Sequence, residues 1–244
     1  MQLKSLIRHY PRLHGLIQYV RDKGLHIQGV RSGSFSQHGE DKIILELLRD
    51  AGANGPFVDI GCNHPFKYNN TYLLQRQGRS GICIDPLPRF RRSYARWRPH
   101  DHFVCVAVGE VEGEMPFYEF EWDMLSTLDA KLAAAYQSAG HRLLRESVVR
   151  VRPINSVLAE LQAKPPLSLI SLDIEGYELT ALRTIDLDYW RPEFICLEVQ
   201  TAVGSSDSDA ADYLKAHGYT TVRNLGLNVI LQRGIGDVSQ GLPR

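Results

Sequence analysis

The sequence of 244 residues lacks several features that would place it in a specialised class of protein. No run approaches the stretch of about 18 consecutive apolar residues that a membrane-spanning helix requires, and the first residues lack the apolar core and cleavage site of a signal peptide. The four cysteines form no Cys-x-x-Cys pair, which argues against a structural zinc site or a redox dithiol. These absences predict a cytoplasmic protein whose thiols are unpaired.

Net charge is also missing, because 28 basic side chains balance 28 acidic ones. No global field would attract nucleic acid, so a charged partner must be recognised by a local patch. A hydrophobic content of 43% with 23% charged residues is typical of a folded globular chain rather than a disordered one. At roughly 100 to 200 residues per domain, the length fits one large domain with an appendage.

The basic side chains are concentrated near the start of the chain, where six of them are accompanied by only one acid, Asp22, before the first acidic cluster. Residues 3–20 carry apolar side chains at helical spacing, broken at Pro11, and Gly24 is expected to end the second helix. We favour packing of the apolar face on the chain's own domain. Contact of residues 1–30 with an anionic membrane surface or a protein partner stays open, as does a homodimer.

Short apolar runs typical of buried strands alternate with helical patterns from Phe57 onward. The expected parallel strands are 57–60, 81–85, 103–108, 167–174 and 194–199. The expected helices are about 40–50, 70–77, 88–97, 155–162, 177–185 and 207–217. The runs 220–226 and 228–233 are so close that they form an antiparallel hairpin. The pattern predicts an α/β fold with a doubly wound, Rossmann-like and mainly parallel sheet that ends in a hairpin, as in class I methyltransferases.

A second pair of β-rich runs interrupts this alternation between the third and fourth strands. Runs 115–121 and 148–154 flank an alanine-rich helical stretch. We therefore assign residues 1–35 to an N-terminal helical appendage and 36–244 to the main domain, with an insertion at about 112–150. The insertion holds groups that can stack on sugar faces or bond to hydroxyls, namely Tyr118, Trp122, Ser126, Thr127 and Tyr136. We expect it to form the wall of an acceptor site.

Carboxylates gather where the expected strands end, which is where open α/β sheets bind ligands. They are Asp59, Asp85, Asp173, Glu175 and Glu198. Asp85, at the end of the second strand, stands where a carboxylate accepts hydrogen bonds from ribose hydroxyls, although it could instead cap the segment after Pro86. The first turn contains Gly61 but no G-x-G-x-x-G motif, which disfavours NAD and fits a ligand without phosphates.

Several short motifs are weak evidence for a protein family when each is taken alone, but their order and spacing together are specific. They are SQHGED (36–41), FVDIGCNHPFKYNNTYLL (57–74), GRSGICIDPLP (78–88), RPHDHFVCVAVG (98–109), LST (125–127), ISLDIEGYE (170–178) and FICLEVQ (194–200). In these motifs the sequence resembles the FkbM family of S-adenosylmethionine-dependent methyltransferases, over about residues 35 to 200. The resemblance implies a class I methyltransferase fold, S-adenosylmethionine as donor, and O-methylation of a hydroxyl, commonly on a sugar of a natural product or surface glycan.

The resemblance also implies which residues bind the donor. Asp59, Gly61 and Asn63 would form the turn on the methionine side, Asn70 and Thr71 would meet the methionine carboxylate, Asp85 would hold the ribose, Asp101 would approach the adenine, and Asp173 would face the cleft. Two positions depart from the family pattern. Cys62 replaces a smaller residue, and Asp85 replaces a frequent glutamate. Neither departure removes a required group.

A sugar hydroxyl is a poor nucleophile and needs a base or a metal ion to activate it. His64 and Asp173 with Glu175 are the candidate catalytic groups, although His64 could only pin its loop and Glu175 could only cap the next helix. A minority hypothesis places Mg²⁺ or Mn²⁺ between Asp173, Glu175 and Glu198, with or without His64. Otherwise Glu198 would bind acceptor hydroxyls. We favour the side-chain base over the metal.

Two other functions remain compatible with the sequence. One is a non-catalytic scaffold that docks a glycan-assembly complex through the basic N-terminal helices. The other is a methyltransferase of a lipid or a small aromatic acceptor. Neither hypothesis involves nucleic acid. The scaffold, like an enzyme of glycan biosynthesis, would work in the cytoplasm and could be peripheral to the inner membrane surface.

Overall fold

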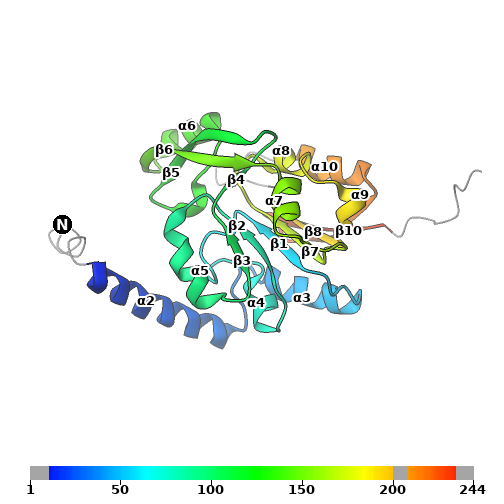
Figure 1. Ribbon diagram of the computed structural model, residues 1–244, viewed down its shortest axis with the longest axis horizontal. Helices are drawn as coiled ribbons and strands as arrows, with labels where there is room; N and C mark the ends of the chain where they lie inside the picture. The colour runs from blue at the N-terminus through cyan, green and yellow to red at the C-terminus, as the bar shows by residue number, and fades with distance from the viewer. Residues whose placement is uncertain (1–10, 200–207, 235–244) are drawn as a thin grey trace, which may run out of the picture.

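The computed structural model describes residues 11–199 and 208–234, and its centre is a seven-stranded sheet in the order β3-β2-β1-β7-β8-β10-β9 (Figure 1). The strands are β1 (Phe57–Ile60), β2 (Gly81–Ile84), β3 (His102–Val104), β7 (Leu169–Leu172), β8 (Phe194–Glu198), β9 (Tyr219–Asn224) and β10 (Asn228–Arg233). All pairs are parallel except those that β10 makes with β8 and β9. The order reverses between β1 and β7, so ligands are expected at the carboxyl ends of these strands. The predicted doubly wound sheet with a terminal hairpin is confirmed.

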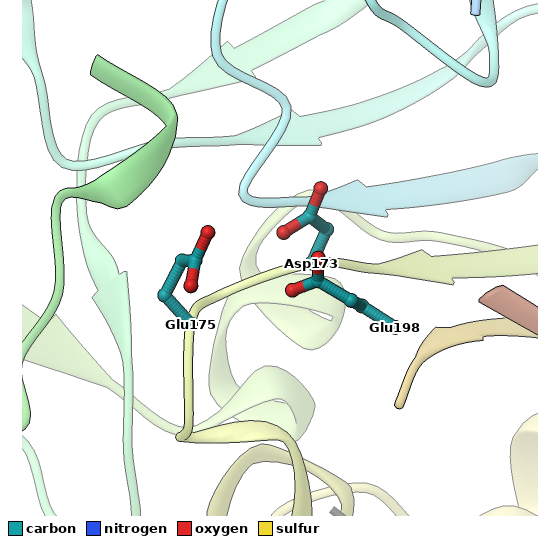
Figure 2. Close-up of side chains that lie close together, drawn as sticks. All are labelled: Asp173, Glu175 and Glu198. Atoms are coloured by element: carbon teal, nitrogen blue, oxygen red, sulfur yellow. The ribbon is translucent and has the colours of Figure 1, made fainter. Parts of the chain in front are cut away.

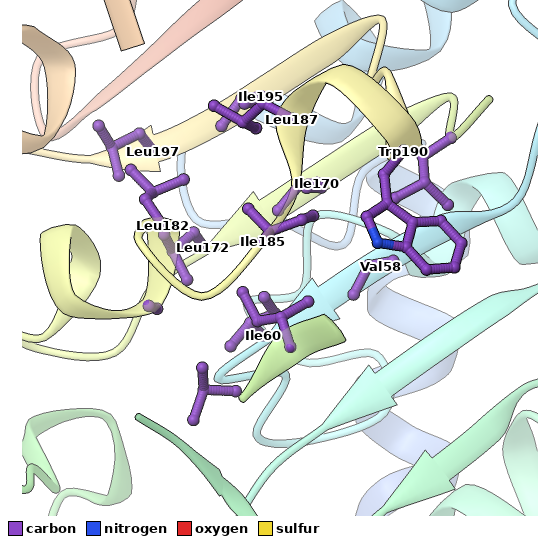
Figure 3. Packing of buried hydrophobic residues seen from close by; sticks show 14 of the residues in the cluster. Val58, Ile60, Ile170, Leu172, Leu182, Ile185, Leu187, Trp190, Ile195 and Leu197 are labelled. Atoms are coloured by element: carbon purple, nitrogen blue, oxygen red, sulfur yellow. The ribbon is translucent and has the colours of Figure 1, made fainter. Parts of the chain in front are cut away.

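Helices cover both faces of the sheet (Figure 1). One layer contains α3 (Glu40–Asp50), α4 (Tyr72–Arg76), the 3-10 helix η1 (Pro88–Phe90) and α5 (Arg91–Trp97). The other contains α7 (Ile154–Glu160), α8 (Glu178–Leu182), α9 (Leu187–Trp190) and α10 (Ser208–Ala216). Side chains alternate along each strand, so that Val58 and Ile60 pack with Trp190 in one core (Figure 3), while Phe57 packs with Ile44 in the other.

The expected third strand, 103–108, is two strands that belong to different sheets. After β3 the chain turns, and β4 (Ala107–Val108) joins a second sheet of order β4-β6-β5. The insertion supplies its other two strands, β5 (Gly113–Phe120) and β6 (Leu143–Arg152), and the helices η2 (Asp123–Leu125) and α6 (Ala130–Ser138) between them. A single apolar run does not reveal such a turn, because both halves have the same apolar, β-rich composition. The turn brings Val106 to the ligand side of the main sheet.

Helix α2 (Pro11–Ser32) runs through Gly24, so the prediction that this glycine ends a helix is wrong. The side of α2 that packs on the domain carries aromatic and polar groups: the rings of Tyr19 and His26 stack on Trp97, with centroids 6.4 and 4.9 Å apart, and Nε2 of His26 lies 2.9 Å from the hydroxyl of Tyr72. The apolar side chains lie mainly on the exposed side. The side chains of the expected apolar face that the structure describes, Leu16, Ile17 and Val20, are all exposed, so for this part of the face the expected packing is also wrong.

The helix predicted before Pro11 falls outside the described residues. None of the helices in the described ranges is long and apolar enough to cross a bilayer. The four cysteines are unpaired, as expected.

Candidate active site

A cavity of about 580 Å³ lies at the carboxyl ends of the strands, within the usual size range of small-molecule sites. Its walls come from the loops after β1, β2 and β7, from the insertion and from α2. Eight of the sequence-predicted site residues line it: Gly61, Asn63, His64, Asp85, Trp122, Ser126, Asp173 and Glu175. The sheet thus brings together residues that are more than one hundred positions apart.

The loop after β1 requires a glycine where it meets the loop after β7. Gly61 has a φ of 77°, and a Cβ at this position would overlap the backbone carbonyl oxygen of Asp173. The absence of a side chain leaves backbone at the floor of the cavity. Two residues later, Asn63 donates its backbone N–H to Oδ2 of Asp85 over 2.9 Å. The first loop and the carboxylate after β2 therefore hold each other in place.

Asp85 is a fixed and buried carboxylate on the cavity wall. Its Oδ1 accepts the backbone N–H of Leu87 over 2.8 Å, so it also braces the segment after Pro86, but it does not cap η1, whose N-cap residue is Leu87. Burial is the main reason why its pKa is raised to about 7. A carboxylate oxygen has more than one acceptor site, so both oxygens can still accept a hydroxyl. The apolar neighbours in the lining are Ile84, Leu87, Phe90 and Val106.

Three carboxyl groups meet after β7 and β8 (Figure 2), with one oxygen of each within 4.8 Å of the others. Asp173 and Glu175 line the cavity, whereas Glu198 does not. Burial, and then repulsion between the groups, raises the pKa of Glu175 to about 8 and that of Glu198 to about 12. Burial also raises the pKa of Asp173, but a hydrogen bond with Glu198 limits the rise to about 6. Near neutral pH, Asp173 is therefore the ionised member of the cluster.

The insertion positions Glu175. The hydroxyl of Tyr136 donates to Oε2 of Glu175, and Oγ1 of Thr127 donates to its backbone carbonyl over 2.7 Å. The idea that Glu175 caps the next helix is wrong, because α8 has Tyr177 as its N-cap residue and no side-chain cap. Glu178 holds the loop before this helix, since it accepts the backbone N–H groups of Ile174 and Gly176, each over 2.9 Å. Glu175 is free of that task and faces the cavity.

His64 holds its loop against α2. Its Nδ1 accepts the backbone N–H groups of Phe66 and Lys67, over 3.5 and 3.2 Å, and Nε2 lies 3.5 Å from a carboxylate oxygen of Asp22. Because the Nδ1 lone pair is used, the neutral ring carries its proton on Nε2, facing that carboxylate. No ring nitrogen is left to take a proton from an acceptor. The structure favours the pinning role over the catalytic one.

Four residues expected to bind the donor do not line the cavity: Asp59, Asn70, Thr71 and Asp101. Asp59 lies inside β1, so the alternation of the strand turns it toward the α3–α5 layer, where its Oδ2 accepts the side chains of Asn69 and Thr71 over 3.1 and 2.6 Å. The amide of Asn70 faces Ser171 instead. The hydrogen bonds of these residues stabilise the loop after β1, and the residues do not line the ligand cavity.

Asp101 lies at the opposite edge of the sheet. It precedes β3 instead of following it, and it accepts the backbone N–H of Gly81, the first residue of β2, over 2.8 Å. Its other oxygen accepts Nε of the buried Arg98 over 2.7 Å. The guanidinium of Arg98 also donates hydrogen bonds to Oγ1 of Thr71 and Oδ1 of Asn69, over 2.9 and 3.1 Å. The assignment of Asp101 to adenine is therefore corrected: it anchors a buried network around Arg98, which sequence reasoning missed.

Four residues expected on the acceptor side also lie outside the lining, namely Tyr118, Thr127, Tyr136 and Glu198. Tyr118 and Thr127 pair through their backbones, and Tyr118 packs in the core of the insertion. Residues that sequence analysis did not expect take part instead, and they include Ile17, Gln18, Arg21, Asp22, Leu25, Lys67, Tyr68 and Arg89. No local sequence pattern identifies these residues, and those of α2 line the cavity only because of how this helix packs on the domain. Arg89 bridges Glu119 and Asp123, over 2.9 and 2.6 Å.

This strand order, with a glycine turn after β1 and a fixed carboxylate after β2, defines a class I methyltransferase. The chain matches the model of the methyltransferase FkbM domain over residues 59–221, and it belongs to this family. Membership of this family implies S-adenosylmethionine as the methyl donor.

No curated protein matches the chain. Among solved structures, it is similar to a TehB-like S-adenosylmethionine-dependent methyltransferase from Corynebacterium glutamicum, with 13% identity and a TM-score of 0.41, over 88% of this chain and 98% of that one. It is also similar to the 1,6-didemethyltoxoflavin-N1-methyltransferase of Burkholderia thailandensis, solved with 1,6-didemethyltoxoflavin and S-adenosylhomocysteine, with 12% identity and a TM-score of 0.39, over 90% and 88% of the two chains.

The residues around the first two strands fit this donor. Gly61 leaves room for a ligand against the backbone, and Asp85 would accept the two ribose hydroxyls while the apolar side chains beside it would cover the base. Asn63 would line the methionine side. When bound, S-adenosylmethionine supplies an electrophilic methyl group on a sulfonium.

Proposed function

We propose that this methyltransferase acts on oxygen, and that its acceptor is a hydroxyl of a sugar in a surface glycan or a glycosylated metabolite. The observation that carries the proposal is the position of the Asp173 carboxyl group on the cavity wall, between the donor turn at Gly61 and the insertion. An oxygen nucleophile must lose a proton, and this carboxylate is placed to accept it.

The chemistry of the side chains then follows. The acceptor oxygen would lose its proton to Asp173 and take the methyl group from the sulfonium, whose carbon–sulfur bond would break to leave S-adenosylhomocysteine. Glu198, protonated near neutral pH, bonds to the same carboxylate and holds it. Glu175 is also largely protonated there, so it can donate a hydrogen bond to a second acceptor oxygen.

The lining supports a sugar as the acceptor. Trp122, 46% exposed, offers an aromatic face, and Ser126 and Glu121 offer hydroxyl and carboxylate groups on the same wall. Aromatic faces beside hydroxyl-binding groups are suited to carbohydrate rings. Arg21 and Lys67 add positive charge to the lining.

Donor binding tests the first half of the proposal. Calorimetry should show binding of S-adenosylmethionine and S-adenosylhomocysteine, and Asp85→Ala should weaken it by at least about tenfold, since each hydrogen bond to a charged group contributes about 1.5 to 3 kcal/mol. The exposed Asp50→Ala is the matched control and should bind normally. Undiminished donor binding by Asp85→Ala would refute this donor site.

The acceptor is tested by methyl transfer from labelled donor to sugar nucleotides, extracted glycans, lipids and small aromatic hydroxyl compounds. Tandem mass spectrometry should place the label on a sugar oxygen. Label on nitrogen, or only on a lipid or aromatic compound, would overturn the proposed acceptor while leaving the methyltransferase assignment intact.

A further inference from the structure

The exposed side of α2 is an unusual surface for this molecule. Five of the eleven large hydrophobic side chains exposed in the described ranges belong to this helix: Leu16, Ile17, Val20, Ile27 and Val30. Steps of three, four and seven residues put Leu16, Val20, Ile27 and Val30 on one side of the helix. The helix extends from the body of the molecule (Figure 1), so this side is not covered by the domain.

The exposed charged side chains described on the same helix are all basic. Arg21, Lys23 and Arg31 are exposed, whereas the single acid, Asp22, is only 5% exposed and faces His64. Lys23 follows Val20 by three residues, and Arg31 follows Ile27 by four, so both basic groups lie in the apolar row. Their long aliphatic stems allow the row to be buried while the charged ends stay at a polar surface.

We propose that this outer face of α2, comprising Leu16, Val20, Lys23, Ile27, Val30 and Arg31, binds the surface of an anionic lipid bilayer. The one-signed charge matches anionic headgroups, and the apolar row matches the acyl boundary beneath them. A second copy fits less well, because a symmetric pairing of these faces would bring the same basic groups together.

The position of α2 links this face to the catalytic cavity. Arg21, Asp22 and Leu25 of the same helix line the cavity, so a bilayer bound on the outer face lies beside the cavity mouth. An acceptor carried on a lipid could then enter without leaving the membrane. This consequence for the acceptor rests on the proposed function, whereas bilayer binding itself does not.

Vesicle sedimentation of the full chain tests the inference. The protein should bind phosphatidylcholine vesicles that contain phosphatidylglycerol, bind vesicles of phosphatidylcholine alone far less, and dissociate at high salt. Each basic residue near an anionic surface contributes about fivefold to binding, so Lys23→Glu with Arg31→Glu should lower the partition coefficient by about 25-fold or more. Val20→Ser with Ile27→Ser should also lower it.

Matched controls use equally exposed positions elsewhere. Lys164→Glu with Arg183→Glu, and Val111→Ser with Val148→Ser, should bind vesicles normally. Donor binding measured by calorimetry should be equal in all variants, which shows that they are folded. No binding of the unmodified protein to anionic vesicles, or equal losses in the controls, would refute the inference. A dimer in sedimentation velocity that Val20→Ser with Ile27→Ser abolishes, without vesicle binding, would assign the face to a second copy and overturn it.

Discussion

Replacing Asp173 with asparagine removes the one group of the acidic cluster that both lines the cavity and is ionised near neutral pH. Asparagine keeps the size of the side chain and its hydrogen bonding, but it cannot accept a proton. We expect kcat to fall by about 10² to 10⁴, the usual contribution of a general base. The dissociation constant of the donor should change little, since Asp85 and Gly61 remain.

The pH dependence gives a second and independent measure of the same group. With a pKa of about 6 for Asp173, its carboxylate is about 97% ionised at pH ~7.5 and about 9% ionised at pH ~5, so kcat/KM should fall about tenfold between them. The assay is initial-rate methyl transfer with labelled donor across this range. His64→Ala serves as the contrast, because both ring nitrogens have other partners: it should keep the acid limb of the profile.

Three results would refute this reasoning. Full activity of Asp173→Asn would show that Asp173 is not the general base. An unchanged acid limb of the pH profile in that variant would assign the titration to another group. Loss of turnover on adding chelator, restored by Mg²⁺ or Mn²⁺, would give the activation of the hydroxyl to a metal ion at the three carboxylates instead.

Three further predictions concern stability and the acceptor wall. Arg98→Met should lower the free energy of unfolding in urea by about 3 to 5 kcal/mol, because it leaves buried carboxylates without their cation, whereas the exposed Arg183→Met should have little effect. The donor-free protein should lose stability as pH rises from about 5 to about 8, because the raised pKa values of Glu175 and Glu198 mean that the folded state binds more protons than the unfolded state. Each group lowers the free energy of unfolding by about 1.4 kcal/mol per pH unit between its unfolded and folded pKa values. Changing both residues to Gln should flatten this pH dependence. Trp122→Ala should raise the acceptor KM and leave donor affinity unchanged; loss of donor binding would show that this wall closes over the donor.

The main sheet could be predicted from sequence because its signals are local. Short, mainly apolar runs with turn residues on either side specify β1 and β2, and the order of strands and helices leaves few topologies open. The turn between β3 and β4 has no such signal. The place of α2 depends on ring contacts between His26, Trp97 and Tyr72, which are far apart in sequence and have no period.

The position of a carboxylate relative to its strand explains which site predictions succeeded. Asp85 and Asp173 come one residue after a strand, so they project beyond the sheet edge into the cavity. Asp59 is the third of the four residues of β1, level with Cys83 rather than beyond the sheet edge, and it faces the helical layer; Asp101 comes before a strand and lies at the other edge. Since strand boundaries are the least secure part of a sequence-based assignment, a difference of two positions decides between a ligand contact and a buried support.

The buried carboxyl groups at the cavity serve function rather than folding. Burial raises the pKa values of Asp85, Asp173, Glu175 and Glu198, so each of these groups makes the folded state less stable as pH rises toward neutrality. A protein selected for stability alone would place amides or apolar groups there. Asp59, equally buried, has a cation and two hydrogen-bond donors around it, but no cation pairs with the carboxyl of Asp173 among the described residues. An ionised carboxylate left without a protein cation at the edge of a cavity is a candidate functional group, and the role that we assign to it is to accept the substrate proton.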